Sequence, residues 1–521
     1  MKLTKSQNSG LKKVLKFIES KNDIFVLKGA AGTGKTTLCK NIIEQLEVNG
    51  TLKCILLAPT GRAARILSQK TNKDSSTIHK HIYIQSKLVE YDKSSLKETF
   101  NLRMNENDQN TLYIVDESSM ISNIRTNLDN SGLFYGSGNL LKDLTDYVFN
   151  KSISKKKHKI MFIGDQAQLP PINCSNSPAL DQKILTEYFN LSKNVKVVEH
   201  TLKEIVRQES INNIIEIADF LRKQIEKDKF EKFEISKQTK NCKELNYYDL
   251  ENQFVSKYKI GHTNNPIMIT HSNIASKYKN EWIRKKLFKH RCKHENCNDL
   301  YRCLNLKTLE KEESLIAVQN SYKYDILNGD TLTVKKIFSE SEENIPVYED
   351  KKDKKPIYLK FIDAIIYKYS YDENKLVEQK VKILINSLSS NKNSISKKES
   401  NALNAYAAGK YQHLYKKIKN KLRNKDTDPF MKAFFEDEHR NALHVKYGYS
   451  ITCHKSQGGE WNDAYIDFSF STTDKKAPLT KKYFRWSYTA ITRAKNNIYH
   501  INSSKIKFIS NNDNQKIINY K

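Results

Sequence analysis

A glycine-rich loop near the N-terminus constrains the fold of this chain more than any other feature. The loop, Gly29-Ala-Ala-Gly-Thr-Gly-Lys-Thr36, follows an apolar run at Ile24 to Leu27 and precedes a helical pattern at Thr37 to Leu46. This is the spacing of a phosphate-binding loop, whose backbone N–H groups and following helix surround a β-phosphate. The pattern therefore predicts an α/β sheet that binds ATP or GTP. Lys35 is expected to reach the β and γ oxygens, and Thr36 to hold Mg²⁺ through its hydroxyl.

A pair of carboxylates supplies the second half of the predicted nucleotide site. Leu112 to Val115 is an apolar run that ends directly in Asp116 and Glu117. Hydrolysis of a phosphoanhydride needs one carboxylate to hold Mg²⁺ and another to polarise the attacking water. We expect Asp116 to bind the metal and Glu117 to act as the base. An acidic pair at a strand end can also be merely solvated, so this assignment depends on the loop upstream.

Apolar runs of strand-like composition recur along the chain and alternate with helical stretches. In the first part of the chain they stand at Ile24 to Leu27, Lys53 to Leu57, Leu112 to Val115, Ile160 to Ile163 and Val195 to Val198. Such alternation predicts a parallel α/β sheet. A second set stands at Pro266 to Thr270, Ala464 to Ile466 and Asn497 to Ile501. It predicts a second α/β domain that is interrupted by an insertion.

The predicted insertion has a composition of its own. It carries strand-like runs at Thr331 to Ile337 and Ile357 to Phe361, and then Lys-rich helical sequence around Leu414 to Leu422. The strand-like runs predict a small β-barrel. The stretch Ser387 to Ser400 is rich in Ser, Asn and Lys, and we expect a mobile loop there.

The charge balance indicates a polyanionic partner. The chain carries 89 Lys and Arg against 59 Asp and Glu, a formal net charge of +30. Clustered cations gain free energy by releasing counterions from nucleic-acid phosphates. A compositional bias of the genome would also enrich Lys, Asn and Ile, so the charge alone leaves nucleic-acid binding open.

Other compositional features narrow the class of protein. No apolar stretch approaches the roughly 20 residues of a membrane span, and residues 1–10 lack the apolar core of a signal peptide. We therefore expect a soluble, cytoplasmic protein with no membrane partner. The eight cysteines are scattered and are expected to be reduced. Cys292, His294, Cys297 and Cys303 lie close together, but their spacing fits no usual zinc pattern well, and metal binding there is left open.

Several longer motifs resemble those of superfamily 1 DNA helicases of the RecD/Dda type. The stretch Phe162-Ile-Gly-Asp-Gln-Ala-Gln-Leu-Pro-Pro171 is similar to motif III of this group, a far more specific pattern than the loop alone. Gln7 resembles the adenine-reading glutamine of the Q motif. Further similar segments are Ala58 to Ala64 (motif Ia), Thr77 to His79 (the segment after it), Leu202 to Gln208 (motif IV), Tyr447 to Trp461 (motif V), Trp486 to Ala494 (motif VI) and Ser321 to Asp330 (start of the inserted barrel).

The resemblance implies a domain organisation. It implies two tandem RecA-like P-loop NTPase domains with a small inserted β-hairpin and an inserted SH3-like β-barrel. The implied boundaries are 1–200 for the first RecA-like domain with its hairpin at 81–110, 201–307 and 439–521 for the second, and 308–438 for the SH3-like and Lys-rich insertion. The Lys-rich region 387–423 has no counterpart that we can name.

In this group the hairpin splits the duplex. Its expected arms are Ile82 to Leu88 and Thr99 to Arg103. A wedge needs a bulky side chain that stacks on the last base pair, and Tyr91 or Phe100 is available for this.

The resemblance also implies roles for individual residues. The implied catalytic residues are Lys35, Asp116, Glu117, Gln168, Arg207 and Arg493. Gln168 would sense the γ-phosphate, and the two arginines would neutralise its charge. The implied ATP contacts are Gln7, Gly29, Ala30, Ala31, Gly32, Thr33, Gly34, Lys35, Thr36, Thr37, Gln168, Gly458, Glu460 and Arg493. The implied Mg²⁺ ligands are Thr36 and Asp116. The implied DNA contacts are Pro59, Thr60, Arg62, Thr77, His79, Thr452, His454 and Lys455.

The implied function is that of an ATP-dependent DNA helicase. It would move 5′ to 3′ along single-stranded DNA and unwind duplexes in repair, recombination or replication. Its implied partners are single-stranded DNA and junctions with duplex, and a single-stranded DNA-binding protein is a further candidate. Three alternatives stay open, namely a motor that does not unwind, RNA as the track, and a nucleotide-gated scaffold without sustained turnover.

Overall fold

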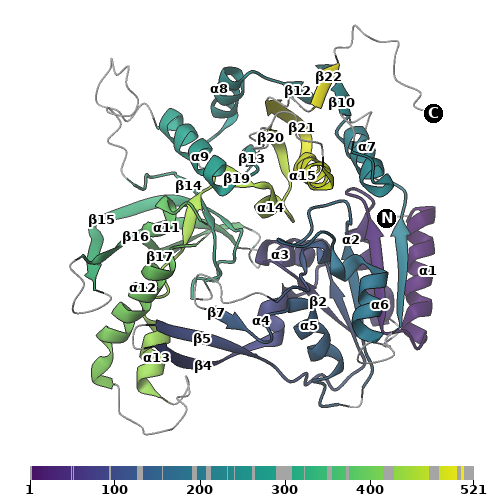
Figure 1. Ribbon diagram of the computed structural model, residues 1–521, viewed down its shortest axis with the longest axis horizontal. Helices are drawn as coiled ribbons and strands as arrows, with labels where there is room; N and C mark the ends of the chain where they lie inside the picture. The colour runs from purple at the N-terminus through teal and green to yellow at the C-terminus, as the bar shows by residue number, and fades with distance from the viewer. Residues whose placement is uncertain are drawn as a thin grey trace.

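The first part of the chain forms a six-stranded sheet in the computed structural model (Figure 1). The strands, in spatial order, are β3 (Ser75–Thr77), β2 (Lys53–Ala58), β6 (Thr111–Val115), β8 (His158–Gly164), β1 (Ile24–Gly29) and β9 (Val197–Leu202). All neighbouring pairs are parallel. The parallel sheet predicted from the apolar runs is thus confirmed, and we call it the first sheet.

The structure describes most of the chain. The described residues are 3–48, 50, 52–92, 95–125, 133–154, 156–190, 196–206, 213–230, 233–236, 238–239, 241–260, 264–288, 308–321, 323–348, 355–370, 373, 375–392, 394–414, 428–468, 480–501 and 506–509. The possible zinc ligands Cys292, His294, Cys297 and Cys303 lie outside them, as do Arg207 and the Lys-rich stretch 415–427. Over the described ranges, no helix has both the length and the apolarity that crossing a membrane requires.

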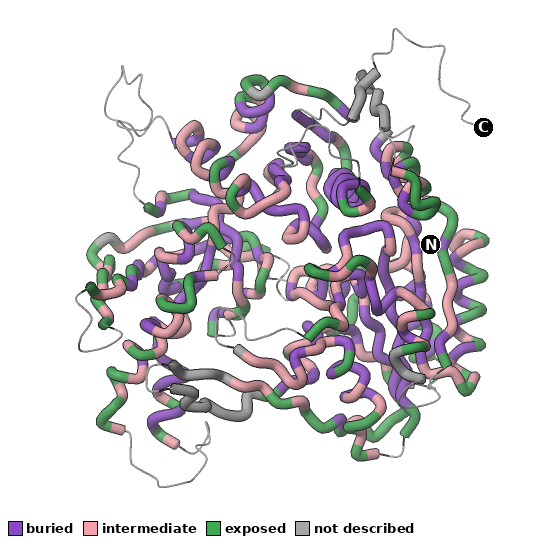
Figure 2. Tube along the Cα trace, in the orientation of Figure 1, coloured by how far each residue is buried: buried purple, intermediate pink, exposed green. Residues whose placement is uncertain are grey.

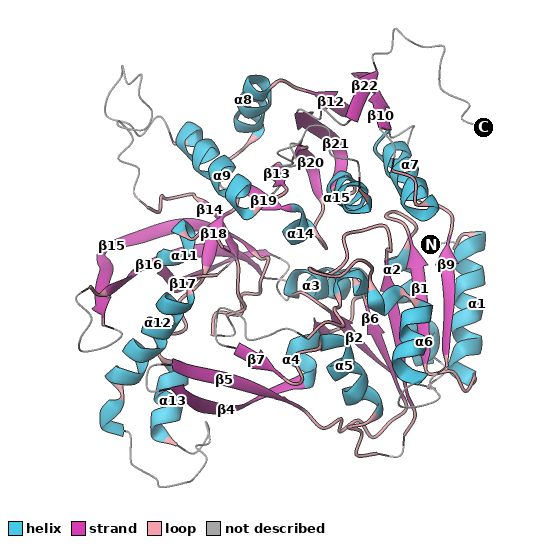
Figure 3. Ribbon diagram, in the orientation of Figure 1, coloured by secondary structure: helices cyan, strands magenta, loops and turns pink. Residues whose placement is uncertain are grey.

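Helices cover both faces of the first sheet (Figures 1 and 3). They are α1 (Lys5–Glu19), α2 (Lys35–Val48), α3 (Gly61–Thr71), α4 (Ile78–Ile82), α5 (Leu140–Phe149) and α6 (Gln182–Asn190), with short 3₁₀ turns η1 (Ser118–Met120) and η2 (Pro178–Leu180). Successive residues of β1 enter opposite cores, since Ile24 and Val26 belong to one apolar cluster and Phe25 and Leu27 to another. Burial on both faces explains why β1 is a continuous apolar run rather than an alternating one.

A second six-stranded sheet follows, in the order β11 (Gln238–Thr239), β12 (Cys242–Glu244), β21 (Ala494–Ile501), β20 (Trp461–Asp467), β13 (Ile267–Thr270) and β19 (Ser450–Thr452). Its pairs are parallel except for the β11–β12 hairpin. Its helices are α7 (Asn213–Lys227), α8 (Tyr247–Lys257), α9 (Asn273–Leu287), α14 (Cys453–Ser456) and α15 (Lys481–Ile491). A small parallel pair, β10 (Phe233–Ser236) and β22 (Ile506–Ile509), lies beside it. This second sheet confirms the predicted interrupted α/β unit.

The insertion is an antiparallel five-stranded sheet, which we call the inserted sheet. Its strands are β17 (Lys375–Leu384), β16 (Ile357–Ser370), β15 (Thr331–Val347), β14 (Ser314–Ala317) and β18 (Val445–Tyr447). Its two edges are bridged, because the Leu384 N–H donates to the Leu443 carbonyl at 3.0 Å and the Leu443 N–H donates to the Lys382 carbonyl at 2.8 Å. The sheet therefore curls toward a barrel, while its kinship to SH3 folds stays a prediction. Since β18 pairs with β14, this unit extends past the predicted boundary at residue 438.

The prediction of a mobile loop at Ser387 to Ser400 is wrong at both ends of the stretch. Helix α11 (Asn386–Ser389) and helix α12 (Lys397–Lys410) occupy its two ends. A capping box starts α12, in which the Ser396 hydroxyl accepts from the Glu399 N–H and the Glu399 carboxylate accepts from the Ser396 N–H. Polar composition was misleading here, because a few apolar side chains of α12 suffice to dock the helix on β16. A further helix, α13 (Pro429–Glu436), follows the turn η4 (Gln412–Leu414).

The predicted hairpin is present as an antiparallel pair, β4 (Tyr83–Asp92) and β5 (Ser95–Leu102), with β7 (Leu133–Tyr135) beside β5. Its arms are longer than predicted, and α12 lies against β5 (Figure 1). Phe100 does not suit the role of wedge, because it lies near the base of the hairpin and its ring stacks on Tyr135 at 4.5 Å. The side chain of the other wedge candidate, Tyr91, lies outside the described residues.

Candidate nucleotide site and nucleic-acid interface

The glycine-rich loop connects β1 to α2 at the carboxyl edge of the first sheet. The Lys35 ammonium donates to the carbonyls of Gly29 and Ala30 at 2.8 and 3.0 Å, so it lies over the mouth of the loop. Glycine is required at position 34, where φ is +76° and a Cβ would come within 2.2 Å of the Gln7 amide nitrogen. The glycine-rich loop in this conformation presents its backbone N–H groups to a phosphate.

Asp116 and Glu117 follow the end of β6, next to that loop. The Asp116 carboxylate accepts from the Glu117 N–H at 2.8 Å, and Glu117 has a left-handed backbone with φ of +49°. Burial raises the pKa of both carboxyl groups, and the Asp116 charge raises the pKa of Glu117 further. Lys35 opposes the rise at both residues. The Asp116 carboxylate and the Thr36 hydroxyl are hard oxygen ligands of the kind that Mg²⁺ prefers, so these residues fit the implied metal.

Gln168 lies in the loop after β8 and is 4% exposed. Its amide oxygen is buried and accepts no hydrogen bond from the residues that the structure describes. A buried acceptor without a donor costs about 1–3 kcal/mol, which a donor on a bound molecule would recover. A water next to a γ-phosphate is such a donor.

Arg493 follows α15 and brings a cation of the second sheet to the acidic pair of the first. Its guanidinium donates through Nε to the Thr489 carbonyl, through Nη1 to the Gly459 carbonyl and through Nη2 to the Thr492 hydroxyl, at 3.0 to 3.1 Å. It is 4% exposed, and its charge lowers the pKa of Glu117. The other expected arginine, Arg207, lies outside the described residues.

Tyr488 of α15 joins the two sheets, and the sequence analysis gave it no role. Its hydroxyl donates to the Asp165 carboxylate at 2.6 Å and accepts from the Ala31 N–H of the glycine-rich loop at 3.1 Å. The side chain is 1% exposed, and burial with the nearby Asp165 charge raises its pKa. A tyrosine shortly before Arg493 was the available signal, but its partners are distant in sequence.

Other hydrogen bonds tie the loop after β8 to the second sheet. The Leu169 N–H donates to the Thr489 hydroxyl, and the Gln457 amide donates to the Leu169 carbonyl, both at 2.9 Å. Every residue of α15 from Tyr483 to Ile491 is buried, and Figure 2 shows this helix in purple between the two sheets. The segments predicted as motifs III, V and VI therefore meet in one interface.

Gln7 has both ends of its amide engaged inside the protein. Its oxygen accepts from the Thr4 N–H at 3.0 Å, and its nitrogen donates to the Thr33 carbonyl at 3.1 Å. The amide thereby ties the start of α1 to the glycine-rich loop. Adenine reading by Gln7 stays a prediction and would have to use the remaining lone pair and N–H.

Three of the expected DNA contacts are helix caps. Thr60, Thr77 and Thr452 precede α3, α4 and α14, and each hydroxyl accepts from a backbone N–H of its helix. Each hydroxyl proton can still be donated to a phosphate. Pro59 stands directly before Thr60, in the turn between β2 and α3.

The other expected DNA contacts differ in charge. Burial lowers the pKa of His79 to about 4, and the rings of Tyr83 and Tyr135 enclose it. Burial lowers the pKa of His454 as well. Both imidazoles are thus neutral near pH 7 and can serve as hydrogen-bonding or stacking groups. Arg62 lies over the Trp461 ring at 4.4 Å, where the first sheet's α3 meets the second sheet.

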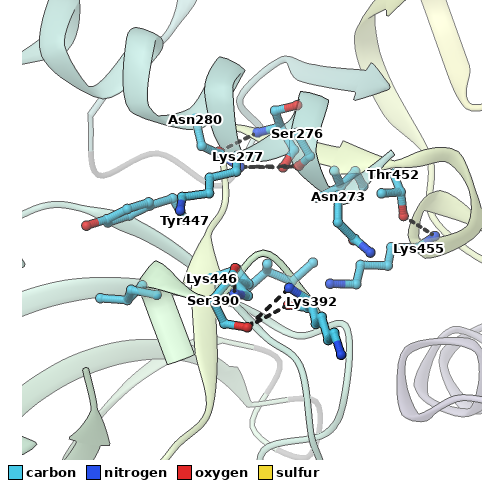
Figure 4. Close-up of a pocket in the computed structure, with 14 residues that line it drawn as sticks. Asn273, Ser276, Lys277, Asn280, Ser390, Lys392, Lys446, Tyr447, Thr452 and Lys455 are labelled. Carbon is cyan, nitrogen blue, oxygen red and sulfur yellow. Dashed lines mark hydrogen bonds between the residues drawn. The ribbon is translucent and has the colours of Figure 1, made fainter. Parts of the chain in front are cut away.

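Lys455 lines a pocket together with three other lysines, Lys277, Lys392 and Lys446 (Figure 4). The fourteen described residues around this pocket include Asn273, Ser276 and Thr452 but no carboxylate. Lysines without carboxylates make a site for an anion. The pocket lies where the inserted sheet meets α9 and α14.

Two of the expected ATP contacts are not brought to the glycine-rich loop by any described contact. Glu460 forms an ion pair with Lys495 at 3.7 Å. Gly458 lies against Ala63 of α3, to which a Cβ would approach within 3.4 Å. Thr37 lies in the first turn of α2, and its hydroxyl donates no hydrogen bond to the residues that the structure describes. Over the described residues, no group of His, Cys, Asp and Glu is arranged to hold a metal ion by itself.

Comparison with known proteins gives matches at both ends of this arrangement. A family model described as AAA domain matches residues 2–127, and one described as UvrD-like helicase C-terminal domain matches residues 447–499. The chain is 24% identical over 511 residues to an uncharacterized protein of Methanocaldococcus jannaschii. That match covers 94% of this chain, which spans 37% of the archaeal protein's length.

Two further similarities involve named helicases. Over 96 residues the chain is 43% identical to the ATP-dependent DNA helicase Dda of Enterobacteria phage T4, covering 18% of this chain and 21% of that protein. A solved structure of Pif1 helicase from Bacteroides, in complex with ADP-AlF3 and ssDNA, is 16% identical with a TM-score of 0.45. It covers 98% of this chain and 96% of that one.

Proposed function

Because the chain belongs to the superfamily 1 helicases of the RecD and Dda type, we propose that it is an ATP-driven motor that moves along single-stranded DNA, 5′ to 3′, and unwinds duplex DNA. One observation carries the proposal. Two side chains of the second sheet's unit, Arg493 and Tyr488, reach the acidic pair and the glycine-rich loop of the first. A nucleotide bound there is sensed by both units, so its hydrolysis changes how they sit together.

Each residue of the site has a part in the proposed cycle. Loop N–H groups and Lys35 bind the phosphates of ATP. Mg²⁺, held by Asp116 and Thr36, would neutralise charge on the β and γ phosphates. Glu117 accepts a proton from the water whose oxygen attacks the γ-phosphorus, and Gln168 orients that water. Arg493 neutralises the charge that develops as the bond to the ADP oxygen breaks.

DNA fits the cationic pocket and the capping hydroxyls better than a neutral ligand does. Phosphate contacts from Lys, Thr and helix N-termini fix a strand in register without reading its sequence. The partners we propose are therefore single-stranded DNA and its junctions with duplex, in repair, recombination or replication. The β4–β5 hairpin is the candidate for separating strands, and without a working wedge the same motor would only translocate.

The test is the ATPase rate of the full chain with and without an unstructured DNA oligonucleotide, at several salt concentrations. We expect stimulation of roughly 5- to 150-fold, the span of typical coupling between two sites. Stimulation should weaken as salt rises, because counterion release drives the binding. If RNA raises the ATPase rate and DNA does not, RNA replaces DNA as the proposed track. If neither changes the rate, the result favours a nucleotide-gated scaffold.

Replacement of Tyr488 by Phe should uncouple the two units. The change keeps the buried ring but removes the hydroxyl that joins Ala31 to Asp165. Loss of such a bond costs about 1–3 kcal/mol, so we expect the DNA-stimulated kcat to fall about 5- to 150-fold with a smaller change in KM for ATP. Tyr483→Phe is the matched control, since Tyr483 is buried on the same helix within the second sheet's core. Equal kinetics of the two variants would refute a coupling role for Tyr488.

A further inference from the structure

The lysine pocket is built from two units of the fold. Lys277 comes from α9 and Lys455 from α14, both in the second sheet's unit. Lys446 comes from β18, and Lys392 from the segment between α11 and α12, both in the insertion. In Figure 4 Lys277 is drawn above Lys446 and Lys392, with Lys455 to their right. Of the four lysines, only Lys455 lies in a segment that resembles a motif of the helicase group, together with the lining residues Tyr447, Ser450, Ile451 and Thr452.

Hydrogen bonds fix the insertion to α9 at this pocket. The Lys277 ammonium donates to the Ser389 carbonyl at 2.8 Å and to the Asn391 amide oxygen at 2.9 Å. The Lys446 ammonium donates to the Ser390 carbonyl at 2.5 Å. The segment that follows α11 is therefore held over the pocket by two lysines, one from each unit.

The charges around Lys446 are unbalanced. Lys455 of α14 and Lys277 of α9 repel its ammonium, and Glu399 of α12 is the carboxylate that attracts it. Burial, more than these lysines, lowers the pKa of Lys446 to about 7. Burial also lowers the pKa of Lys455 to about 8. Lys277 has a partner in Glu281 at 4.0 Å, outside the pocket lining. Like charges gathered at low dielectric are costly unless an anion joins them.

We propose that this pocket binds one backbone phosphate of the DNA track, so that the insertion is half of the grip on the strand. The proposal rests on the motor function proposed above, and it adds Lys446 and Lys392 to the residues that contact DNA. The phosphate would sit among the four ammonium groups, with the first turn of α9 contributing Asn273 and Ser276. Because α9 begins there, at its N-cap Ser272, its dipole also favours negative charge.

Proton linkage follows from this arrangement. A phosphate beside Lys446 favours the charged amine, so the complex holds that proton to higher pH than the free protein does. Below the free pKa the proton is already present. As pH rises above about 7, binding must take up a proton, and affinity falls by up to about tenfold per pH unit. Arginine at this position stays charged and removes that dependence.

The experiment measures binding of a fluorescent oligothymidylate to the full chain without nucleotide, across salt concentration and from about pH 6 to about pH 9. Lys446→Gln should weaken binding about 5- to 30-fold at the acid end and reduce the slope against log salt by about 1. Lys446→Arg should keep the affinity and lose the fall near pH 7, and Lys392→Ala should lower the slope as well. The control is Lys12→Gln, an exposed lysine of α1.

The outcomes separate the site from the motor. If Lys446→Gln and Lys12→Gln bind DNA alike and the Lys446→Arg profile matches the wild type, the pocket is not a DNA subsite, although the motor function would stand. Inorganic phosphate is the second probe. If it binds the wild type but not Lys446→Gln while DNA binding is unchanged, the pocket takes a free anion, and the proposal is overturned. Absence of any DNA binding or stimulation by the wild type would instead refute the motor function itself.

Discussion

Glu117→Gln is expected to lower the DNA-stimulated ATPase rate by about 10² to 10⁴-fold, the usual contribution of a positioned base. Glutamine keeps the size of the side chain and a hydrogen-bond acceptor but cannot take the proton of the attacking water. Arg493 and Lys35 both lower the pKa of the Glu117 carboxyl, so two cations act on this side chain. The loop N–H groups and Lys35 are untouched, so ATP binding should remain within a few-fold of the wild type.

Binding and turnover must be measured separately to test this expectation. Fluorescent ATP binding and oligonucleotide binding should be retained by Glu117→Gln while steady-state phosphate release is lost. Glu199→Gln serves as the control, because Glu199 is a carboxylate of the same sheet that pairs with Lys28 at 2.5 Å on the neighbouring strand. A rate for Glu117→Gln within tenfold of that control would move the role of base to another group. Loss of ATP binding would mean that Glu117 acts through the metal and not on the water.

The nucleotide half of the site could be predicted because its parts are local in sequence. The glycine-rich loop, its strand and its helix are contiguous, and Asp116 and Glu117 directly follow an apolar strand. Parallel strands place their carboxyl ends at one edge, which brings Gln168 to the same place once β8 is recognised. The alternation of apolar runs was enough to locate five of the six strands of the first sheet, β1, β2, β6, β8 and β9.

The rest of the site depends on contacts that no local pattern encodes. Tyr488 meets Ala31 and Asp165 across several hundred residues, and only the packing of α15 makes the meeting visible. Lys446 and Lys392 are ordinary lysines of a Lys-rich chain until the inserted sheet folds them against α9. Composition was also a poor guide at α12, where a polar stretch forms a helix, and at Phe100, whose aromatic ring stacks on Tyr135.

Arg493→Ala is expected to reduce the DNA-stimulated ATPase rate by about 10³-fold or more, the scale of an arginine that reaches a transferring phosphoryl group. A guanidinium carries five N–H donors, and in this structure three described bonds hold it to Thr489, Gly459 and Thr492. Two N–H groups remain for phosphate oxygens. Three N–H groups of the guanidinium thus hold it in place, and the other two can donate to the phosphate.

Arg493→Lys separates charge from this geometry. A lysine restores the positive charge, but its ammonium cannot hold the three acceptors and a phosphate together, so its rate should recover by less than about tenfold over Arg493→Ala. Thermal unfolding of both variants checks that the interface survives, and oligonucleotide binding should be retained because Arg493 does not line the lysine pocket that we propose for DNA. Full activity in Arg493→Lys would show that charge alone suffices. Activity near wild type in Arg493→Ala would remove Arg493 from the reaction and leave its three bonds as a structural brace between the segments around α15 and β20.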